Sequence, residues 1–255
     1  IGTLLDAHNE DDLLASGEWG PDPIRWGRVR SALDPGPEGA LASKLDRLEE
    51  RDSRPYPMLV DVSFETAEPF DLQPGQYVTV RYDEVSRPYS IASSPNADGT
   101  SISVRHVPDG TLTPKLCTEL EVGDKLTVRG PNGDFLLEQP SPRDVVFLAT
   151  GTGVAPFKSM IDYVFEEGND TFEGEKRDVW LFLGCAWEDA LPYRDAFRAY
   201  DDEYDNFHFV PTLSREENLS DWAGETDYVQ HTLVNCLGVK PRGLSVDSRS
   251  NCEGQ

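Results

Sequence analysis

Hydrophobic and polar residues alternate in short segments from Tyr56 to about Gln139. The segments are MLVDVSFE, QYVTVRY, SIAS, SISVRHV, KLTVRG and FLLE, and the turn-forming sequences QPG, NADG, PDG, EVGD and GPNGD separate them. Regular short strands with Gly and Pro turns are typical of a closed antiparallel barrel or sandwich. One helix is predicted among these strands, TPKLCTEL, with Thr113 as its N-cap and Pro114 at its first helical position.

A different pattern begins after the sequence SPRD. DVVFLAT (144–150) is a continuous apolar run, as expected of a strand that is buried on both faces, and a helix with one apolar stripe follows GTGVAP. The unit then repeats as the strand DVWLFLG, the helix ALPYRDAFRAYDDEY, the strand NFHFVPTL and the helix DYVQHTLVNCLG. Strands that alternate with helices predict a doubly wound parallel sheet.

The two patterns predict a two-domain protein. An antiparallel β-barrel occupies residues 55–140, and an α/β domain with a doubly wound parallel sheet occupies residues 141–255. Residues 1–54 are rich in Asp, Glu, Gly and Pro, and we interpret them as an acidic extension or insertion around the first strand. Within it, WGRVRSAL (26–33) is predicted as a strand and LASKLDRLEE (41–50) as a short exposed helix.

Charge narrows the classes of partner. The 255 residues include 47 acidic and only 23 basic side chains, for a formal net charge of -24. This composition resembles that of proteins from salt-loving organisms, and it argues against binding to nucleic acid or to an anionic membrane. No apolar run reaches the roughly 18 residues of a membrane span, and the first residues lack a secretion signal, so we expect a soluble, cytoplasmic protein. The cysteines and histidines are too scattered to predict a metal site.

The sequence GTGVAP (151–156) is the first candidate for chemistry. It follows the first strand of the predicted parallel sheet, and ligands of such sheets bind outside the carboxyl ends of the strands. Two glycines let backbone amides approach an anion, and Pro156 begins a helix whose N-terminus favours a phosphate. The loop is not the G-x-G-x-x-G fingerprint, and a tight turn of purely structural purpose is the alternative.

A barrel that carries R-x-Y-S (87–90), followed by an α/β domain that opens with G-T-G-V-A-P, resembles the ferredoxin-NADP reductase family of flavoproteins. The resemblance runs from about Tyr56 to Leu244. It implies that Arg87 pairs with the pyrophosphate of FAD, that Tyr89 lies against the isoalloxazine and that Ser90 hydrogen-bonds its N5 edge. Tyr89 and Ser90 are thereby the residues nearest the reaction. An edge strand with an ordinary proline and an exposed arginine is the alternative.

Further matches follow in family order. VRHVPDGTLT is similar to the segment in which a glycine and a hydroxyl residue hold the flavin phosphates, here Gly110 and Thr113. GPNGDF (130–135) resembles the loop that closes the barrel. In the second domain the resemblance assigns the dinucleotide phosphates to Gly151, Thr152 and Gly153, and it places Tyr193, Arg194 and Asp195 at the family's Y-R-D position.

The third strand of the second domain ends in TLSREE. In NADP-using members a Ser-Arg pair at this place grips the 2'-phosphate and a later tyrosine stacks on the adenine, which implies these roles for Ser214, Arg215 and Tyr228. Ser214 with Glu217 also fits a capping box, and Thr226 stands where plant-type members place a second basic residue. The sequence therefore favours NADP, with NAD as the alternative.

The C-terminal sequence departs from the family, because Cys252 precedes Glu253 where a Cys-Gly pair is expected. A shortened chain and a nicotinamide site built otherwise both remain open. The sequence predicts a flavoprotein that passes a hydride from NAD(P)H to FAD and then electrons to ferredoxin or flavodoxin. The alternatives are a reductase module of an oxygenase or larger complex, and a flavin-binding product without nicotinamide turnover.

Overall fold

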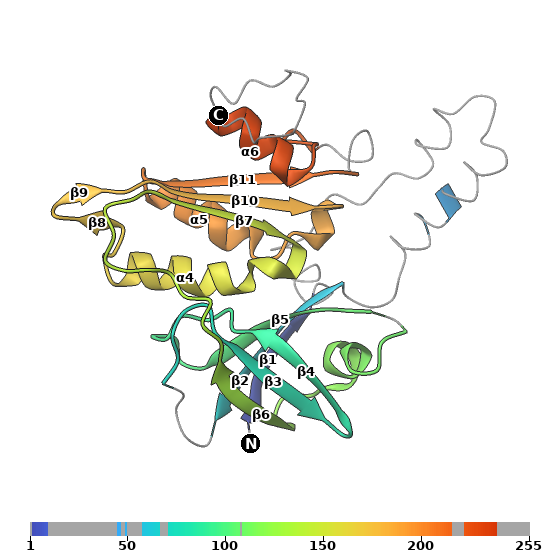
Figure 1. The fold of residues 1–255 in the computed structure, drawn as a ribbon. Helices are drawn as coiled ribbons and strands as arrows, with labels where there is room; N and C mark the ends of the chain where they lie inside the picture. The colour runs from blue at the N-terminus through green and yellow to red at the C-terminus, as the bar shows by residue number, and fades with distance from the viewer. Residues whose placement is uncertain are drawn as a thin grey trace, which may run out of the picture.

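The computed structural model describes residues 2–9, 45, 46, 49, 58–66, 71–107, 109–215 and 222–238, and they form two stacked domains (Figure 1). The strand expected at 26–33 lies outside these residues. Of the helix expected at 41–50, residues 45, 46 and 49 are described and are helical. Leu45 is only 5% exposed, so this helix buries a side chain, whereas its sequence predicted an exposed one. The predicted domain boundaries stay predictions.

The first domain is a six-stranded antiparallel barrel. Its strands are β1 (Gly2–Asn9), β2 (Leu59–Thr66), β3 (Tyr77–Tyr82), β4 (Val85–Ser90), β5 (Thr100–Arg105) and β6 (Lys125–Asn132). They are ordered β4-β3-β6-β1-β2-β5, and a bridge between Ile91 and Ile102 brings the two outer strands together. The sequence pattern did not predict β1, which pairs with both β2 and β6.

Alternation fills the barrel with side chains from every other position. Val60, Val62 and Phe64 of β2 are buried, as are Val78 and Val80 of β3, because successive residues of a strand point to opposite faces. A short π-helix, η1 (Lys115–Glu119), adds Leu116 and Cys117 to this core.

Three local predictions in the barrel were wrong. SIAS (90–93) was expected to form a strand, but β4 already ends at Ser90, with RPYS as its last four residues. FLLE (135–138) is not a strand, because Gly133, with φ of 103°, turns the chain away from β6 and the ring of Phe135 packs against Phe157 of the second domain. Thr113 is not the N-cap of the predicted helix, since it is already helical and its hydroxyl bonds Val107.

The second domain is built as the sequence predicted. Its parallel strands β7 (Val145–Thr150), β10 (Val179–Cys185) and β11 (Phe207–Leu213) lie in the order β11-β10-β7. Helices α4 (Ala155–Glu166) and α5 (Arg194–Glu203) lie on one face and α6 (Val229–Leu237) on the other (Figure 1). Two short helical turns, η2 (Gly151–Val154) and η3 (Glu188–Ala190), and the hairpin β8 (Thr171–Phe172) to β9 (Glu175–Lys176) complete it.

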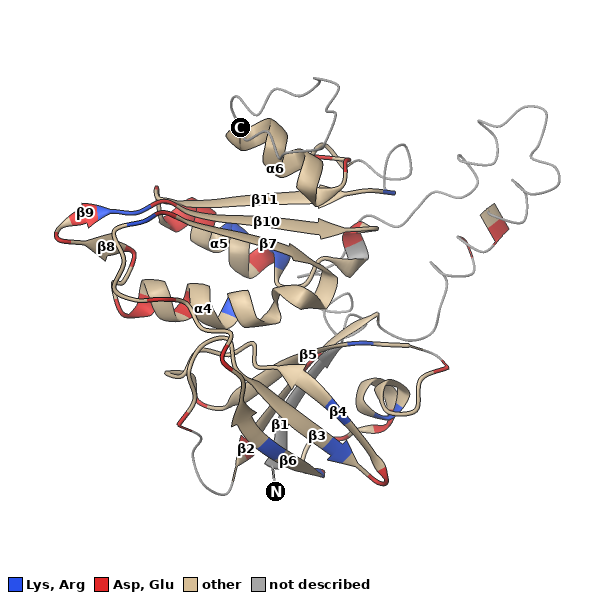
Figure 2. Ribbon diagram, viewed as in Figure 1, with Lys and Arg blue, Asp and Glu red and all other residues tan. Residues whose placement is uncertain are grey.

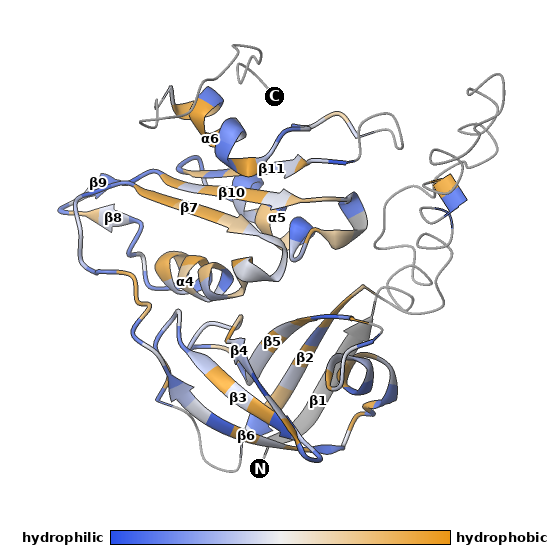
Figure 3. Cartoon of the chain, turned by 45° about the vertical axis from the view of Figure 1, so that its right-hand side comes forward, coloured by the Kyte–Doolittle hydropathy of each residue, from blue (hydrophilic) through white to orange (hydrophobic). Residues whose placement is uncertain are grey.

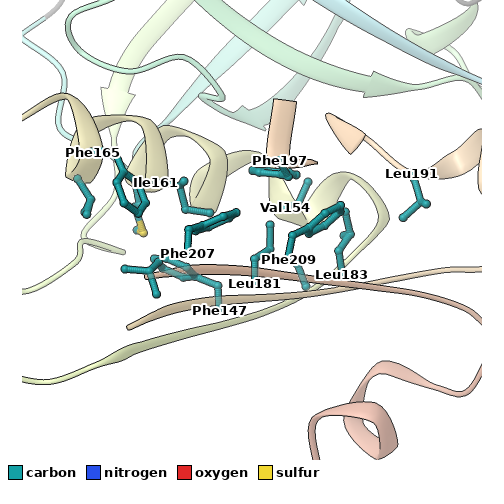
Figure 4. Close-up of a cluster of buried hydrophobic side chains, with 14 of the residues drawn as sticks. Phe147, Val154, Ile161, Phe165, Leu181, Leu183, Leu191, Phe197, Phe207 and Phe209 are labelled. Carbon is teal, nitrogen blue, oxygen red and sulfur yellow. The ribbon is translucent and has the colours of Figure 1, made fainter. Parts of the chain in front are cut away.

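An apolar core joins this sheet to α4 and α5. The first strand, β7, was predicted to be buried on both faces, but only one face is covered, because Val146 is 45% exposed and Leu148 is 43% exposed. Figure 4 shows Phe197 and Ile161 directed from the helices toward Leu181 and Phe207 of the sheet, and all four are 0–1% exposed. The hydrophobic colour of β7 and β10 contrasts with the polar β8–β9 hairpin (Figure 3).

No helix in the described ranges is both long and apolar enough to cross a membrane.

Candidate flavin and dinucleotide site

A cavity of about 330 Å³ opens where the carboxyl ends of the parallel strands meet the barrel. The barrel contributes Met58, Leu59 and Arg105. The α/β domain contributes the turn after β7, the end of β10 and the start of α6; its lining residues are Thr150, Gly151, Thr152, Gly184, Cys185, Ala186, Trp187, Ala190, Ser214, Asp227, Tyr228, Val229 and Gln230. This is the edge at which parallel sheets bind their ligands.

The turn after β7 has the open backbone that the sequence predicted. Gly151 has a φ of 50°, which favours glycine, and a Cβ added to Gly151 or Gly153 would meet no atom within 4 Å. Pro156 lies in the first turn of the twelve-residue helix α4, as predicted. Gly151 and Thr152 line the cavity, and Gly153 is exposed beside them. A ligand can therefore approach this turn closely at the N-terminus of a helix.

Ser214 and Arg215 extend the pairing of β11 with β10. The N–H of Ser214 donates to the carbonyl of Cys185 at 2.9 Å, and the N–H of Arg215 donates to that of Ala186 at 3.0 Å. Ser214 lines the cavity, and Arg215 follows it with an exposed side chain. The capping box remains untested, because Glu217 lies outside the described residues.

Tyr228 begins α6 at the opposite wall of the cavity. It is the N-cap residue of the helix, it lines the cavity and it is 61% exposed, so a ligand can reach its side chain. Asp227 accepts the N–H of Tyr228 at 2.6 Å, and its Oδ1 lies 3.0 Å from Nδ1 of His231. The cavity thus presents a carboxylate and a phenol side by side.

The predicted flavin residues lie on β4, outside this cavity. Arg87 and Tyr89 pair with Val80 and Val78 of β3, so both extend from the same side of β4. The Tyr89 ring packs against the barrel core, and burial raises the pKa of its hydroxyl to about 12. Arg87 is exposed and donates to the carbonyl of Ser86 at 2.8 Å. Ser90 extends from the other side, opposite Tyr77.

Gly110 and Thr113 form a compact turn before η1. Thr113 Oγ1 accepts the N–H of Val107 at 3.0 Å, and the N–H of Gly110 donates to the carbonyl of Val107 at 2.8 Å. A Cβ on Gly110 would lie 2.8 Å from Thr113 Oγ1, which explains the glycine. These bonds give both residues a structural task, and their contact with flavin phosphates stays a prediction.

Sequence reasoning missed four residues that shape the cavity. Arg105 adds a cation from the barrel, Asp227 adds a carboxylate and Trp187 adds an aromatic wall. Gly184 ends β10 where a Cβ would lie only 2.8 Å from Cβ of Val229, so glycine lets α6 pack against the strand. The position of residues 184–187 at the carboxyl end of a parallel strand is the signal that could have identified Gly184 and Trp187.

The comparisons with known proteins agree with this geometry. Residues 58–136 match the oxidoreductase FAD-binding domain family, and residues 147–242 match the oxidoreductase NAD-binding domain family. Ferredoxin–NADP reductase B of Sorangium cellulosum is 33% identical over 181 residues, which are 68% of this chain and 70% of that protein. The chain belongs to the ferredoxin-NADP reductase family.

A second relative and a solved structure are also similar to this chain. The xylene/toluene monooxygenase electron transfer component XylA of Pseudomonas putida is 33% identical over 214 residues, 82% of this chain and 57% of that protein. A ferredoxin-NADP+ reductase of Neisseria gonorrhoeae, solved with bound FAD and NADP, has the same fold, with a TM-score of 0.58, 24% identity and 70% of each chain covered. The chain spans about half the length of several curated relatives that it matches.

Proposed function

We propose that this protein is a flavin-dependent reductase that takes a hydride from NADPH onto FAD and passes electrons singly to a ferredoxin- or flavodoxin-type carrier. The observation that carries the proposal is the cavity between the domains, which brings Gly151, Thr152, Ser214 and Tyr228 from three separate segments to one place. Membership of the ferredoxin-NADP reductase family supports it. Its place in the cytoplasm stays a prediction.

The residues of β4 suit FAD. The exposed guanidinium of Arg87 can fork onto pyrophosphate oxygens, and the Tyr89 ring offers a flat apolar face whose hydroxyl stays neutral because its pKa is about 12. The hydroxyl of Ser90 can donate or accept a hydrogen bond at the ring edge. Bound FAD supplies the redox chemistry, and the protein has to orient the nicotinamide against it.

The cavity suits the dinucleotide. The amides of Gly151, Thr152 and Gly153 can bind its phosphates, because nothing lies above the two glycines and α4 begins there. Arg105 lines the cavity from the barrel and can add a cation to the same phosphates. The exposed ring of Tyr228 can stack on the adenine.

The choice between NADPH and NADH depends on two opposed charges. Arg215 directly follows the lining residue Ser214, and a guanidinium there can bind a 2'-phosphate. Asp227 also lines the cavity, and a carboxylate near the ribose hydroxyls is characteristic of NAD sites. Oδ1 of Asp227 already contacts the N–H of Tyr228 and the ring of His231, which leaves it less available to the ribose hydroxyls. We therefore favour NADPH.

The barrel carries a basic surface that an acidic electron carrier could use. Arg81 of β3 pairs with Thr127 of β6, and alternation puts Lys125 and Arg129 on the same face as Thr127. All three basic side chains are exposed. Acidic residues are numerous in α4 and α5 and near the β8–β9 hairpin, and they also occur in the turns of the barrel (Figure 2). Despite a net charge of -24, this face of the barrel favours an acidic partner.

A second candidate function is that of a reductase component of an oxygenase. The observation that favours it is the likeness to the xylene/toluene monooxygenase component, which covers 82% of this chain. In that case the electrons pass to a partner within the complex. Efficient reduction of free ferredoxin at low micromolar concentrations would count against this candidate.

One spectroscopic experiment tests the proposed function. The protein is loaded with FAD in molar salt, and its visible spectrum is recorded before and after anaerobic addition of NADPH. Loss of the flavin band within seconds is the expected result. A flavin band that persists with both NADPH and NADH would contradict the reductase and would favour a flavin-binding product without nicotinamide turnover.

A further inference from the structure

Polar contacts join the two domains, and the proposed chemistry does not use them. Ser159 of α4 is 0% exposed and donates its hydroxyl to the carbonyl of Ser93 at 2.7 Å. At the other end of α4, Glu166 accepts hydrogen bonds from Ser94 and, at 3.2 Å, from the amide of Asn96. These contacts fasten α4 to the segment that follows β4, and they hold one side of the domain interface.

Tyr193 makes a further contact between the domains. Its hydroxyl donates to Oδ1 of Asp61 on β2 at 3.1 Å. Burial raises the pKa of Tyr193 well above its ordinary value, and the charge of Asp61 adds to that shift, so the phenol remains a donor at neutral pH. Nζ of Lys158 lies 5.6 Å from the ring centroid, and a φ of 57° is uncommon for a residue with a Cβ. The surroundings therefore hold Tyr193 in one conformation.

This hydrogen bond joins the two walls of the dinucleotide cavity. Asp61 follows Leu59 by two residues on β2, and Leu59 lines the barrel wall. Tyr193 follows Ala190 by three residues, and Ala190 lines the opposite wall. Because each partner is so close in sequence to a lining residue of its own domain, the bond between them constrains the separation of the walls.

We propose that Tyr193 and Asp61 form a positioning pair that sets the orientation of the two domains and hence the distance between nicotinamide and flavin. The proposal rests on the proposed function, since it assigns the pair a task in the same hydride transfer. Transfer rates depend steeply on geometry, and a displacement of about 1 Å can cost as much as about a hundredfold. Neither residue contacts the reacting atoms, so both act through the domain interface.

The chain offers a closely matched control. Tyr200 is a second tyrosine whose hydroxyl donates to an aspartate at 3.1 Å, but its partner, Asp162, belongs to the same domain. Tyr193→Phe and Tyr200→Phe each remove one hydroxyl and keep the ring, and only the first removes a bond between domains. Asp61→Ala removes the acceptor, whereas Asp61→Asn keeps a carbonyl oxygen that can accept the same hydrogen bond.

The test is stopped-flow reduction of the FAD-loaded protein by saturating NADPH. We expect Tyr193→Phe and Asp61→Ala each to slow flavin reduction about tenfold, and the double variant to be no slower than either. Asp61→Asn and Tyr200→Phe are expected to stay within about twofold of the unmodified protein, and the Kd for NADPH within about twofold in every variant. Equal losses in Tyr193→Phe and Tyr200→Phe, or additive losses in the double variant, would overturn the pair.

Calorimetry separates failure of the pair from failure of the proposed function. Absence of flavin reduction in the unmodified protein would contradict the reductase itself. The pair is then judged from heat unfolding of the same FAD-loaded samples, where loss of an interdomain bond weakens the coupling of the two domains. Tyr193→Phe should broaden or split the unfolding transition, and Tyr200→Phe should leave it single. An unchanged single transition in both variants would overturn the positioning pair.

Discussion

The backbone N–H of Ser214 donates to the carbonyl of Cys185 at 2.9 Å, one residue beyond the last pair of strands β10 and β11. The hydroxyl of Ser214 also reaches that carbonyl, at 3.4 Å. This pairing continues to Arg215 and Ala186, so the backbone of Arg215 has a fixed place beside the cavity although its side chain is exposed. An arginine held in this way can discriminate between two dinucleotides that differ by one phosphate.

Replacement of Arg215 by alanine tests that discrimination. We expect Arg215→Ala to raise the KM for NADPH by about tenfold or more and the KM for NADH by less than about twofold, because only NADPH carries a 2'-phosphate that the guanidinium can bind. Steady-state reduction of an artificial acceptor with each nucleotide measures both constants. Equal increases for the two nucleotides would contradict the assignment of Arg215 to the 2'-phosphate.

Alanine is expected to be unfavourable for different reasons at two glycines, Gly184 in the cavity wall and Gly153 beside the cavity. In Gly184→Ala the new Cβ meets Val229 at 2.8 Å, so α6 has to move, and we expect a loss of about 1–3 kcal/mol in unfolding free energy together with a higher KM for NADPH. Gly153→Ala meets nothing within 4 Å, so its stability should be kept while its methyl group obstructs the approach of phosphates.

Urea unfolding and steady-state kinetics of both variants distinguish these effects. Gly153→Ala serves as the stability control for Gly184→Ala, because it adds the same methyl group to a position with open space. If Gly184→Ala unfolds at the same urea concentration as the unmodified protein, the close packing of α6 on β10 is not a constraint in solution.

Flavin affinity is expected to depend on Arg87 and not on its neighbour Arg81. Both are exposed arginines of adjacent strands, but Arg81 lies on the outer face with Glu84 as its partner at 3.6 Å, whereas Arg87 shares a side of β4 with Tyr89. A hydrogen bond to a charged group contributes about 1.5–3 kcal/mol, so Arg87→Ala should weaken FAD binding by about tenfold or more. Arg81→Ala should change it by less than about twofold.

Fluorescence titration of the FAD-free protein measures both dissociation constants, because flavin fluorescence changes on binding. Arg87→Lys keeps the charge and loses the fork, and its affinity should lie between those of the other two proteins. If Arg81→Ala and Arg87→Ala weaken FAD binding equally, net charge alone controls binding. That result would contradict the assignment of Arg87 to the pyrophosphate.

The parts of the fold that were predicted from sequence are those with a strong period. β7, β10 and β11 are rich in apolar residues, and each lies within one residue of its predicted range. Burial on both faces was wrongly predicted for β7, because an apolar run does not show which neighbouring elements cover it. β1 was missed because Asp6 and His8 interrupt its apolar residues, and its pairing with β2 and β6 depends on partners more than fifty residues away. FLLE was mistaken for a strand because a short apolar run does not reveal that Gly133 redirects it.

The residues of the candidate site also divide into those that a local sequence signal predicts and those that have no such signal. The turn after β7 was predicted because two glycines before a helix have a local physical meaning, and Ser214 because TLSREE resembles the family's Ser-Arg pair after the third strand. Arg105 and Asp61 carry no such signal. Their importance comes from the contact between the barrel and the second domain, which joins residues separated by as much as 132 positions. A single sequence holds no pattern that reports such a contact.

The buried thiol of Cys117 should lower the free energy of unfolding at alkaline pH. The thiol is 8% exposed in the barrel core, and burial raises its pKa from 9.0 to about 12. Between these values the unfolded chain has released the thiol proton and the folded chain has kept it, so stability is complete below pH 9 and falls as the pH rises. From pH 9 to pH 10 the expected loss is about 1 kcal/mol.

Urea unfolding at pH 8, 9 and 10 measures this slope in the unmodified protein and in Cys117→Ala. The variant should be less stable at every pH, because it leaves a cavity in the core, but its stability should decline less between pH 9 and pH 10. Burial also raises the pKa of Tyr89, Tyr193 and Tyr200, but these tyrosines are present in both proteins, so the difference between the two curves reports the thiol. Parallel curves for the two proteins above pH 9 would show that the folded thiol ionises as readily as a free one.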